Sequence, residues 1–364
     1  MIAKRQWCIP EALRTTPGTA LEAEDLLNEA QGAAGLLYWM TVRDVHVWAG
    51  TGPGERPGLF REGAAEHRLR LISWAGLPAR AQTALNTIAA ILRIPELASP
   101  GEIATACLDL AEWTATNVGR LTALAFAQSA AVADPDDPDA ALQTGIHALE
   151  EGQLVRAGTW FRRAIALSRR SGKWDSYSAA YIQLATGLLR QGRHDAVRRA
   201  AMKAMRAARR HGTPHRRTQA LHVLMLSARE QGDAVMAERF AHAAWRAARR
   251  EKPASVPLLM DLARWWTDTN PARARTVLRE LLAREAQPGD WALMMALMAR
   301  AAAHKGDRAA FDEAWAGTQR LLRRLAKSEV PDEVAVHLSH SAALFALAPR
   351  HGPEPRPRKD EGDR

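Results

Sequence analysis

Three glycines recur along the chain at intervals of 40 residues, and each lies in a short turn between two stretches of helical periodicity. They are Gly152, Gly192 and Gly232. Alanine stands twelve positions after each of them, at Ala164, Ala204 and Ala244. Small residues at such positions let two helix backbones approach closely, and glycine tolerates the left-handed conformation that ends a helix. The recurrence therefore predicts antiparallel helix pairs, which must stack because one pair cannot bury its apolar stripe alone.

A fourth copy of the pattern is centred on Gly306, with Ala299, Phe311 and Trp315 at the matching offsets. Residues 102–133 form a weaker copy. Residues 256–284 form another, in which Thr269 takes the place of the turn glycine. Ala, Leu and Arg dominate the composition, and all three favour helices, whereas runs of Val, Ile and Thr are nearly absent. The expected fold class is all-α.

The segment 141–167, "ALQTGIHALEEGQLVRAGTWFRRAIAL", carries Gly on a first helix, Gly at the turn, and Ala, Phe and Ala on a second helix. In this pattern the chain resembles the tetratricopeptide repeat (TPR) family over residues 108–325. The family repeat has 34 residues, whereas the best copies here recur at 40. The resemblance implies a right-handed α-solenoid of helix pairs, whose concave surface is lined by the first helix of each pair.

Four segments follow from this pattern. We expect a divergent helical cap at 1–100, with helices at 21–28, 36–48, 66–72 and 79–92, and TPR-like repeats at 101–327. A C-terminal capping helix is expected within 328–349, at 332–347, followed by a disordered tail at 350–364 that is rich in Pro and charge.

Helix starts agree with this division. Asp137-Pro138, Thr213-Pro214 and Asp290 each offer a capping side chain, and two of them precede a proline suited to the first helical position. The acidic stretch 134–139 could also suggest a calcium loop, but Pro138 falls on a ligand position and no Glu closes the loop. We interpret it as a linker and a helix cap.

No recognisable catalytic, metal-binding or phosphate-binding motif occurs in the sequence. Histidines are scattered, and the two cysteines, Cys8 and Cys107, are expected to be small buried residues rather than a disulfide. We therefore expect no catalytic residues, no cofactor and no metal, so the chain is not predicted to be an enzyme. Neither a signal peptide nor an apolar run long enough to span a bilayer is evident, which favours a cytoplasmic protein without membrane contact.

With no catalytic, cofactor or metal site expected, the remaining class of function is binding to another molecule. In the resembled family the concave surface holds an extended peptide or a partner helix. The corresponding positions on the first helices here are Leu142, Ile146, Ile182, Thr186, His222 and Leu226. They are mostly aliphatic, and the basic clamp that co-chaperone members use for a terminal carboxylate is absent. Two alternatives remain open: an apolar groove for an amphipathic helix or hydrophobic peptide, or positions filled by neighbouring helices.

Charge is concentrated in the centre of the chain. Residues 151–250 hold 21 Lys and Arg against 6 Asp and Glu, a local net charge of +15, whereas the whole chain carries +10. Arginine pairs stand seventeen residues after each turn glycine, and the first three are Arg169-Arg170, Arg209-Arg210 and Arg249-Arg250. We expect these six residues to form a basic strip along one edge. Such a strip either complements the negative ends of helix dipoles or attracts an acidic protein segment or a nucleic acid.

The sequence thus predicts a non-catalytic scaffold or adaptor that presents a concave groove to a partner protein or peptide. The alternative is a nucleic-acid-associated or peptide-sensing regulator that uses the arginine-rich central repeats.

Overall fold

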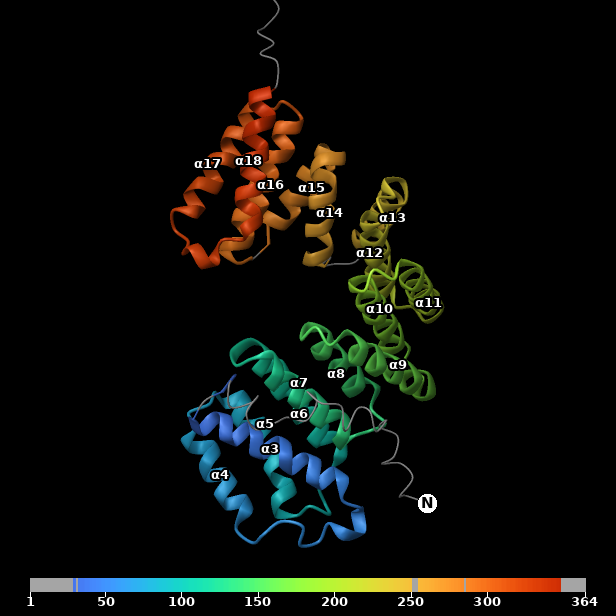
Figure 1. Ribbon diagram of the computed structural model, residues 1–364, viewed down its shortest axis with the longest axis vertical. Coiled ribbons are helices and arrows are strands. Elements are labelled where there is room, and N and C mark those ends of the chain that lie inside the picture. Colours follow the sequence, from blue (N-terminus) through green and yellow to red (C-terminus); the bar gives the residue numbers. More distant parts are fainter. Residues whose placement is uncertain (1–28, 31, 251–254, 285, 348–364) are drawn as a thin grey trace, which may run out of the picture. The chain divides into compact units, whose positions relative to one another are not determined.

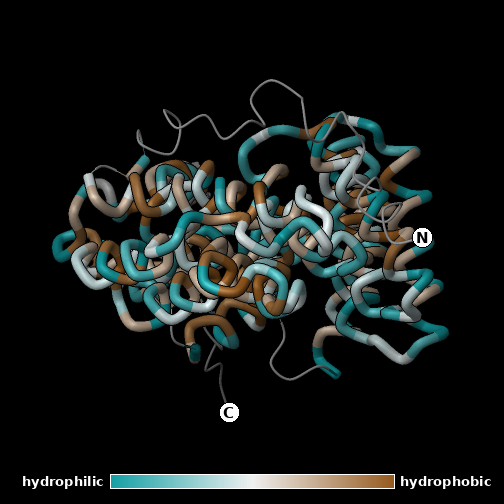
Figure 2. The backbone as a smooth tube through the Cα atoms, turned by 90° about the horizontal axis from the view of Figure 1, so that it is seen from below, coloured by the Kyte–Doolittle hydropathy of each residue, from teal (hydrophilic) through white to brown (hydrophobic). Residues whose placement is uncertain are grey.

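The computed structural model describes residues 29–30, 32–250, 255–284 and 286–347 (Figure 1). These residues form sixteen α-helices and two short 3-10 segments, and none of them lies in a strand. The all-α prediction is confirmed. Hydrophobic and hydrophilic residues are interspersed along the helices (Figure 2), as expected for helices with one buried and one solvated face.

The chain forms two compact units, residues 1–247 and 248–364. The boundary between them falls inside the predicted repeat region 101–327, close to the end of its third glycine-centred copy.

The first unit begins with α3 (Gly32–Gly50), α4 (Ala64–Trp74) and α5 (Ala79–Arg93), with a 3-10 turn, η2 (Pro53–Glu55), between α3 and α4. The helices predicted at 36–48, 66–72 and 79–92 are confirmed, whereas the one at 21–28 lies outside the described residues. Helix α3 packs against α4, α5 and α7, and one core cluster runs from Ala30 to Ala180. The predicted boundary at residue 100 therefore falls within a continuous core.

Four helix pairs follow in the first unit. They are α6 (Pro100–Asn117) with α7 (Arg120–Ala133), α8 (Pro138–Glu150) with α9 (Leu154–Ser171), α10 (Trp174–Arg190) with α11 (His194–His211), and α12 (Pro214–Glu230) with α13 (Ala234–Ala248). We call the first helix of each pair the A helix and the second the B helix. A helices α8, α10 and α12 form one layer and B helices α9, α11 and α13 the other (Figure 1), and α10 packs on both α8 and α12. The predicted TPR-like stack of helix pairs is confirmed.

A glycine in the left-handed conformation follows each helix from α8 to α12. Gly152, Gly192 and Gly232 have φ between 66° and 77°, and so do Gly172 and Gly212, which join a B helix to the next A helix. Since only glycine adopts this region without strain, each of these turns requires a glycine. The glycine spacing in the centre of the chain is therefore 20 residues, half of the period predicted from the sequence.

Close packing within the pairs follows from the small residues. Ala164, Ala204 and Ala244 are completely buried on their B helices. On α8, a side chain at Gly145 would place its first carbon 2.5 Å from the ring of Phe161 on α9. The glycine therefore makes room for the phenylalanine, which is why helices α8 and α9 can approach.

The predicted helix starts are confirmed in part. The Asp137 carboxylate accepts hydrogen bonds from the backbone N–H groups of Asp139 and Ala140, and Pro138 occupies the first turn of α8. Helix α12 starts with Pro214, but the Thr213 side chain makes no capping hydrogen bond. Asp290 was wrongly placed at a helix start: α16 begins at Pro288, and Asp290 lies in its first turn, where a carboxylate complements the helix dipole.

The second unit contains two more pairs and a final helix. These are α14 (Val256–Thr269) with α15 (Pro271–Leu282), α16 (Pro288–His304) with α17 (Arg308–Leu322), a 3-10 turn η3 (Lys327–Glu329), and α18 (Asp332–Leu347). Helix α18 has the predicted bounds and packs on α16. Between α14 and α15, Asn270 caps the second helix through its side chain in place of a glycine turn. The tail predicted at 350–364 lies outside the described residues.

Candidate functional site

A row of half-buried, uncharged side chains runs across the A-helix layer of the first unit. Ile146 on α8, Thr186 on α10 and Leu226 on α12 stand 40 residues apart, and all three are half-buried. Gln143 and Gln183 flank the first two and are half-buried as well. We call these five residues the A-helix row. Its centre carries no formal charge, so it suits apolar and neutral polar groups.

The other predicted groove positions divide between core and surface. Leu142 and Ile182 are buried and belong to the core clusters of the repeats, so their side chains pack against neighbouring helices. His222 on α12 is half-buried. Neighbouring helices thus cover two of the six predicted positions, and the other four are partly accessible.

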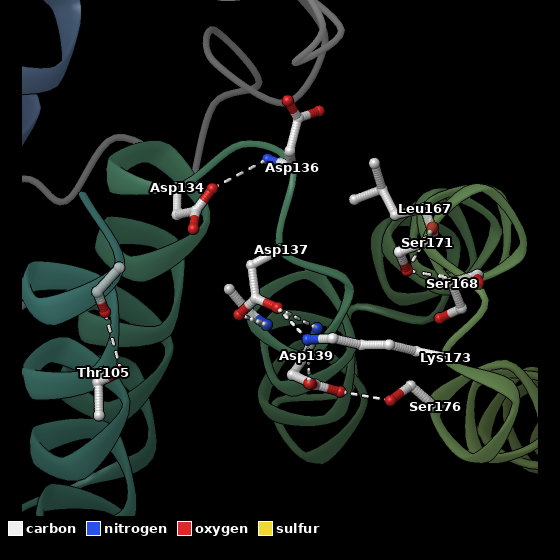
Figure 3. Close-up of polar contacts among 12 residues, drawn as sticks. Thr105, Asp134, Asp136, Asp137, Asp139, Leu167, Ser168, Ser171, Lys173 and Ser176 are labelled. Atoms are coloured by element: carbon white, nitrogen blue, oxygen red, sulfur yellow. Dashed lines mark hydrogen bonds and ion pairs between the residues drawn. The ribbon is translucent and has the colours of Figure 1, made fainter. Parts of the chain in front are cut away.

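Polar links between successive A helices lie at the ends of this row. On the α8–α10 side, the Lys173 ammonium is 3.2 Å from an Asp137 oxygen and 3.0 Å from an Asp139 oxygen (Figure 3). The hydroxyl of Ser176 donates to Asp139 at 2.6 Å. Burial opposes the charge of Lys173, but the hydrogen bonds and charges of Asp139 and Asp137 outweigh it and raise the pKa of Lys173.

Helices α10 and α12 are joined in the same way. Asp175 accepts two hydrogen bonds from the Arg216 guanidinium, at 3.0 and 2.6 Å, and its carboxylate is 3.0 Å from His215 Nε2. The hydrogen bonds from Arg216, reinforced by the charges of Arg216 and His215 and opposed by partial burial, hold the pKa of Asp175 below its ordinary value. At the opposite end, Arg190 donates to the carbonyl of Leu149 on α8 at 2.7 Å.

The contacts of the aspartates in the acidic stretch 134–139 show what these residues do in the fold. Asp137 caps α8, Asp139 and Asp137 bind Lys173, and Asp136 forms an ion pair with Arg170 at 2.6 Å. Asp134 accepts a hydrogen bond from the Asp136 backbone (Figure 3), and burial raises its pKa. The interpretation as a linker and helix cap is supported, because the carboxylates are engaged by cations and N–H groups of the chain itself.

The six residues of the predicted basic strip lie at or directly after the ends of B helices. Arg169 and Arg170 lie in the last turn of α9, Arg209 and Arg210 in the last turn of α11, and Arg249 and Arg250 directly after α13. Neighbouring residues of a helix point about 100° apart. Arg170 accordingly reaches back to Asp136 of the preceding loop, whereas the charge of Arg169 acts on Tyr177 of the following helix. The pairs thus mark the C-terminal ends of B helices, and the two members of the first pair face different neighbours.

A row of aromatic rings, which the sequence reasoning missed, lies beside Arg169. Trp174, Tyr177 and Tyr181 follow one another on α10 with ring centroids 5.5 and 4.9 Å apart. The ring of His211, at the end of α11, is stacked on Trp174 at 4.1 Å with an interplanar angle of 6°. The Lys203 ammonium lies over the Tyr181 ring at 5.4 Å from its centroid. The spacing i, i+3, i+7 of the three α10 residues is the signal in the sequence that places them on one helix face.

Two further expectations concern the cysteines and the absence of a metal site. Cys107 is completely buried, and burial raises the pKa of its thiol, whereas Cys8 lies outside the described residues. Within the described ranges, no three His, Cys, Asp or Glu side chains are grouped so that they could hold a metal ion. Among the described helices, none is both long enough and apolar enough to cross a membrane.

Comparison with known proteins gives structural likenesses of low sequence identity. No family model and no curated protein sequence matches the chain. Among solved structures, PilF from Pseudomonas aeruginosa aligns with a TM-score of 0.48 and 16% identity, over 67% of this chain and 98% of that one.

Two further structures cover more of the chain. A Rap protein complexed with competence and sporulation factor aligns with a TM-score of 0.48 and 10% identity, over 89% of this chain and 96% of that one. The APC/C hetero-tetramer Cut9–Hcn1 aligns with a TM-score of 0.40 and 14% identity, over 89% of this chain and 69% of that one. These likenesses concern the helical architecture alone, and the repeat described above is defined by the chain's own glycines, alanines and helix pairs.

Proposed function

We propose that the chain is a non-catalytic scaffold that binds a partner protein or peptide along the A-helix row. The observation that supports this function is the recurrence of a half-buried, uncharged position at Ile146, Thr186 and Leu226. A helix layer that only completed the core would bury these positions, as it buries Leu142 and Ile182. Their partial exposure at a constant interval suits an extended or helical ligand that crosses successive repeats.

The ion pairs at the ends of the A helices support the same function. Lys173 with Asp137 and Asp139, and Asp175 with Arg216, join neighbouring repeats at one end of the layer. They hold the A helices in register, so the row is organised before a ligand arrives. Preorganisation of this kind reduces the entropy lost on binding.

Site-specific photo-crosslinking in the native host tests this proposal. A photoreactive residue at Thr186 should capture a partner, whereas the same residue at Thr83 on α5 should not. The two positions are matched, because each hydroxyl donates to the carbonyl of its own helix four residues earlier. Thr186 is half-buried in the A-helix row, whereas Thr83 is exposed elsewhere on the unit.

A second test introduces charge in the neighbouring repeats. Ile146→Glu and Leu226→Glu place a carboxylate at half-buried positions of the row and should each abolish the Thr186 crosslink without unfolding the chain, as judged by circular dichroism. Equal crosslinking from Thr186 and Thr83, or a Thr186 crosslink that persists in both variants, would refute this function.

A further inference from the structure

A second surface of the first unit differs in chemistry from the A-helix row. It lies on α10, on the side where α10 packs against both α9 and α11. We define it as the aromatic-basic surface, formed by Trp174, Tyr177 and Tyr181 of α10, Arg162 and Arg169 of α9, and Lys203 of α11. The charges of Arg169 and Lys203 both act on the Tyr177 hydroxyl, so cations from two B helices converge on the same rings.

Acidic residues of α9 and α11 themselves compensate almost none of the positive charge on these two B helices. Helix α9 contains five arginines and no acidic residue, and α11 contains five arginines and one lysine against Asp195 alone. Arg162, Arg169 and Lys203 are exposed, and none of the three has an ion-pair partner among the described residues. Other cations of this unit do find carboxylates: Arg170 pairs with Asp136, and Arg216 with Asp175. Arg162, Arg169 and Lys203 therefore present unpaired positive charge at this surface.

A small hollow, lined by both aliphatic and polar residues, adjoins these cations at the other end of α9. It has a volume of about 90 Å³, and Leu154, Gly158, Arg162, Leu184 and Leu188 are among the residues that line it. Val155 at its edge is 83% exposed, an unusual degree for a branched aliphatic side chain in a helix. Arg162 lines the hollow and stands two turns before Arg169 on the same face of α9, so the hollow and the aromatic-basic surface adjoin along this helix.

We propose that the aromatic-basic surface and its hollow are a docking site for an acidic segment of a partner protein that carries an aliphatic anchor residue. Carboxylates would bind Arg162, Arg169 and Lys203 by charge-assisted hydrogen bonds. The anchor would enter the hollow at Gly158, where no side chain of this residue takes up space. This site is separate from the A-helix row and does not depend on the function proposed for that row.

The rings favour a protein segment over a nucleic acid. Single strands bind proteins by stacking bases on free ring faces. Here the Trp174 face is stacked on His211, Tyr177 contacts both neighbouring rings edge-on, and the Tyr181 face lies under Lys203. Base stacking would have to displace these contacts, whereas carboxylates need only the exposed cations beside them.

Fluorescence anisotropy on the full chain tests the proposal. The probes are a labelled peptide of alternating Glu and Leu residues, a poly-Glu peptide of equal charge, and an oligothymidine of equal charge. At low ionic strength we expect the Glu-Leu peptide to bind best, and its affinity to fall as salt screens the carboxylates. The triple variant Arg162→Gln, Arg169→Gln, Lys203→Gln should weaken this binding at least tenfold.

The matched control is the triple variant Arg170→Gln, Arg198→Gln, Arg209→Gln, which removes the same charge from the same two helices. Arg198 and Arg209 stand five and six residues from Lys203, roughly 120–140° around α11. This control should bind within twofold of the wild type. Leu184→Glu should weaken the Glu-Leu peptide more than poly-Glu, because only the former uses the hollow. Equal weakening by both triples, or oligothymidine binding that alone depends on the first triple, would overturn the proposal.

Discussion

At the scale of single residues, the distance between two packed helices depends on glycines, which have no side chain. Gly145 and Gly158 both lie inside helices, one on α8 and one on α9, yet they differ in surroundings. A methyl group at Gly145 would lie 2.5 Å from the fully buried Phe161 ring. At Gly158 the nearest atoms are at ordinary contact distances, 3.7 Å to Arg162 and 4.0 Å to Leu184.

We therefore expect opposite effects of the same substitution at the two glycines. Gly145→Ala should lower the free energy of unfolding, because overpacking costs about 1–3 kcal/mol and exceeds the gain in helix propensity of about 1 kcal/mol. Gly158→Ala should leave stability unchanged or raise it by up to about 1 kcal/mol. Urea denaturation measures both. Equal stability of the two variants would contradict the close α8–α9 approach.

A buried ion pair in the N-terminal helices gives a second prediction. Arg68 on α4 is 2.7 Å from Asp44 on α3, and the two side chains are only 6% and 3% exposed. Asp44→Ala would leave the arginine buried without its carboxylate, so we expect a loss of about 3–5 kcal/mol in the free energy of unfolding. The double variant Asp44→Leu, Arg68→Met should recover much of this loss. If urea denaturation shows that the double variant is less stable than Asp44→Ala, the expected recovery is wrong and the ion pair itself stabilises the fold.

At the scale of helices, regular features could be predicted from the sequence and pairwise contacts could not. The turn glycines and the buried alanines follow a fixed period, so their roles were predictable from spacing. The direction of Arg169 and Arg170 was not, because a constant offset gives the end of the helix but not the face of each side chain. The aromatic row was missed for another reason: Trp174, Tyr177 and Tyr181 occur in one repeat only, so comparing repeats hides them.

The link between α10 and α12 predicts a pH dependence. Because the folded state lowers the pKa of Asp175, its contribution to stability is present above the ordinary carboxyl pKa and is lost as pH falls through the folded value. Asp175 is about half exposed, so the contribution should stay below about 1 kcal/mol. Asp175→Asn should therefore be less stable than the wild type at pH 6, with the difference shrinking as pH falls to 3. A difference that does not vary with pH in paired urea titrations would argue against this ion pair.

At the scale of the whole molecule, two units with separate cores follow a single repeat pattern. Ala204 belongs to a core cluster of α10, α11 and α12 in the first unit, and Ala302 to a cluster of α16 and α17 in the second. Repeat proteins are held together by contacts between neighbouring repeats, so we expect each unit to unfold as a cooperative block of its own. Sequence spacing did not reveal this division, because a turn glycine of the same pattern occurs beyond residue 247, at Gly306.

Two overpacking variants test the division by calorimetry. Ala204→Leu and Ala302→Leu each insert a larger side chain at a buried alanine, and each should cost about 1–3 kcal/mol. We expect the wild type to melt in two transitions, Ala204→Leu to lower only one of them, and Ala302→Leu to lower only the other. The shift should be larger for Ala302→Leu, because a given free-energy loss moves the melting temperature more in a smaller unit. A single transition that both variants lower equally would show that the repeats unfold as one cooperative block, with the A-helix row and the aromatic-basic surface coupled to the second unit.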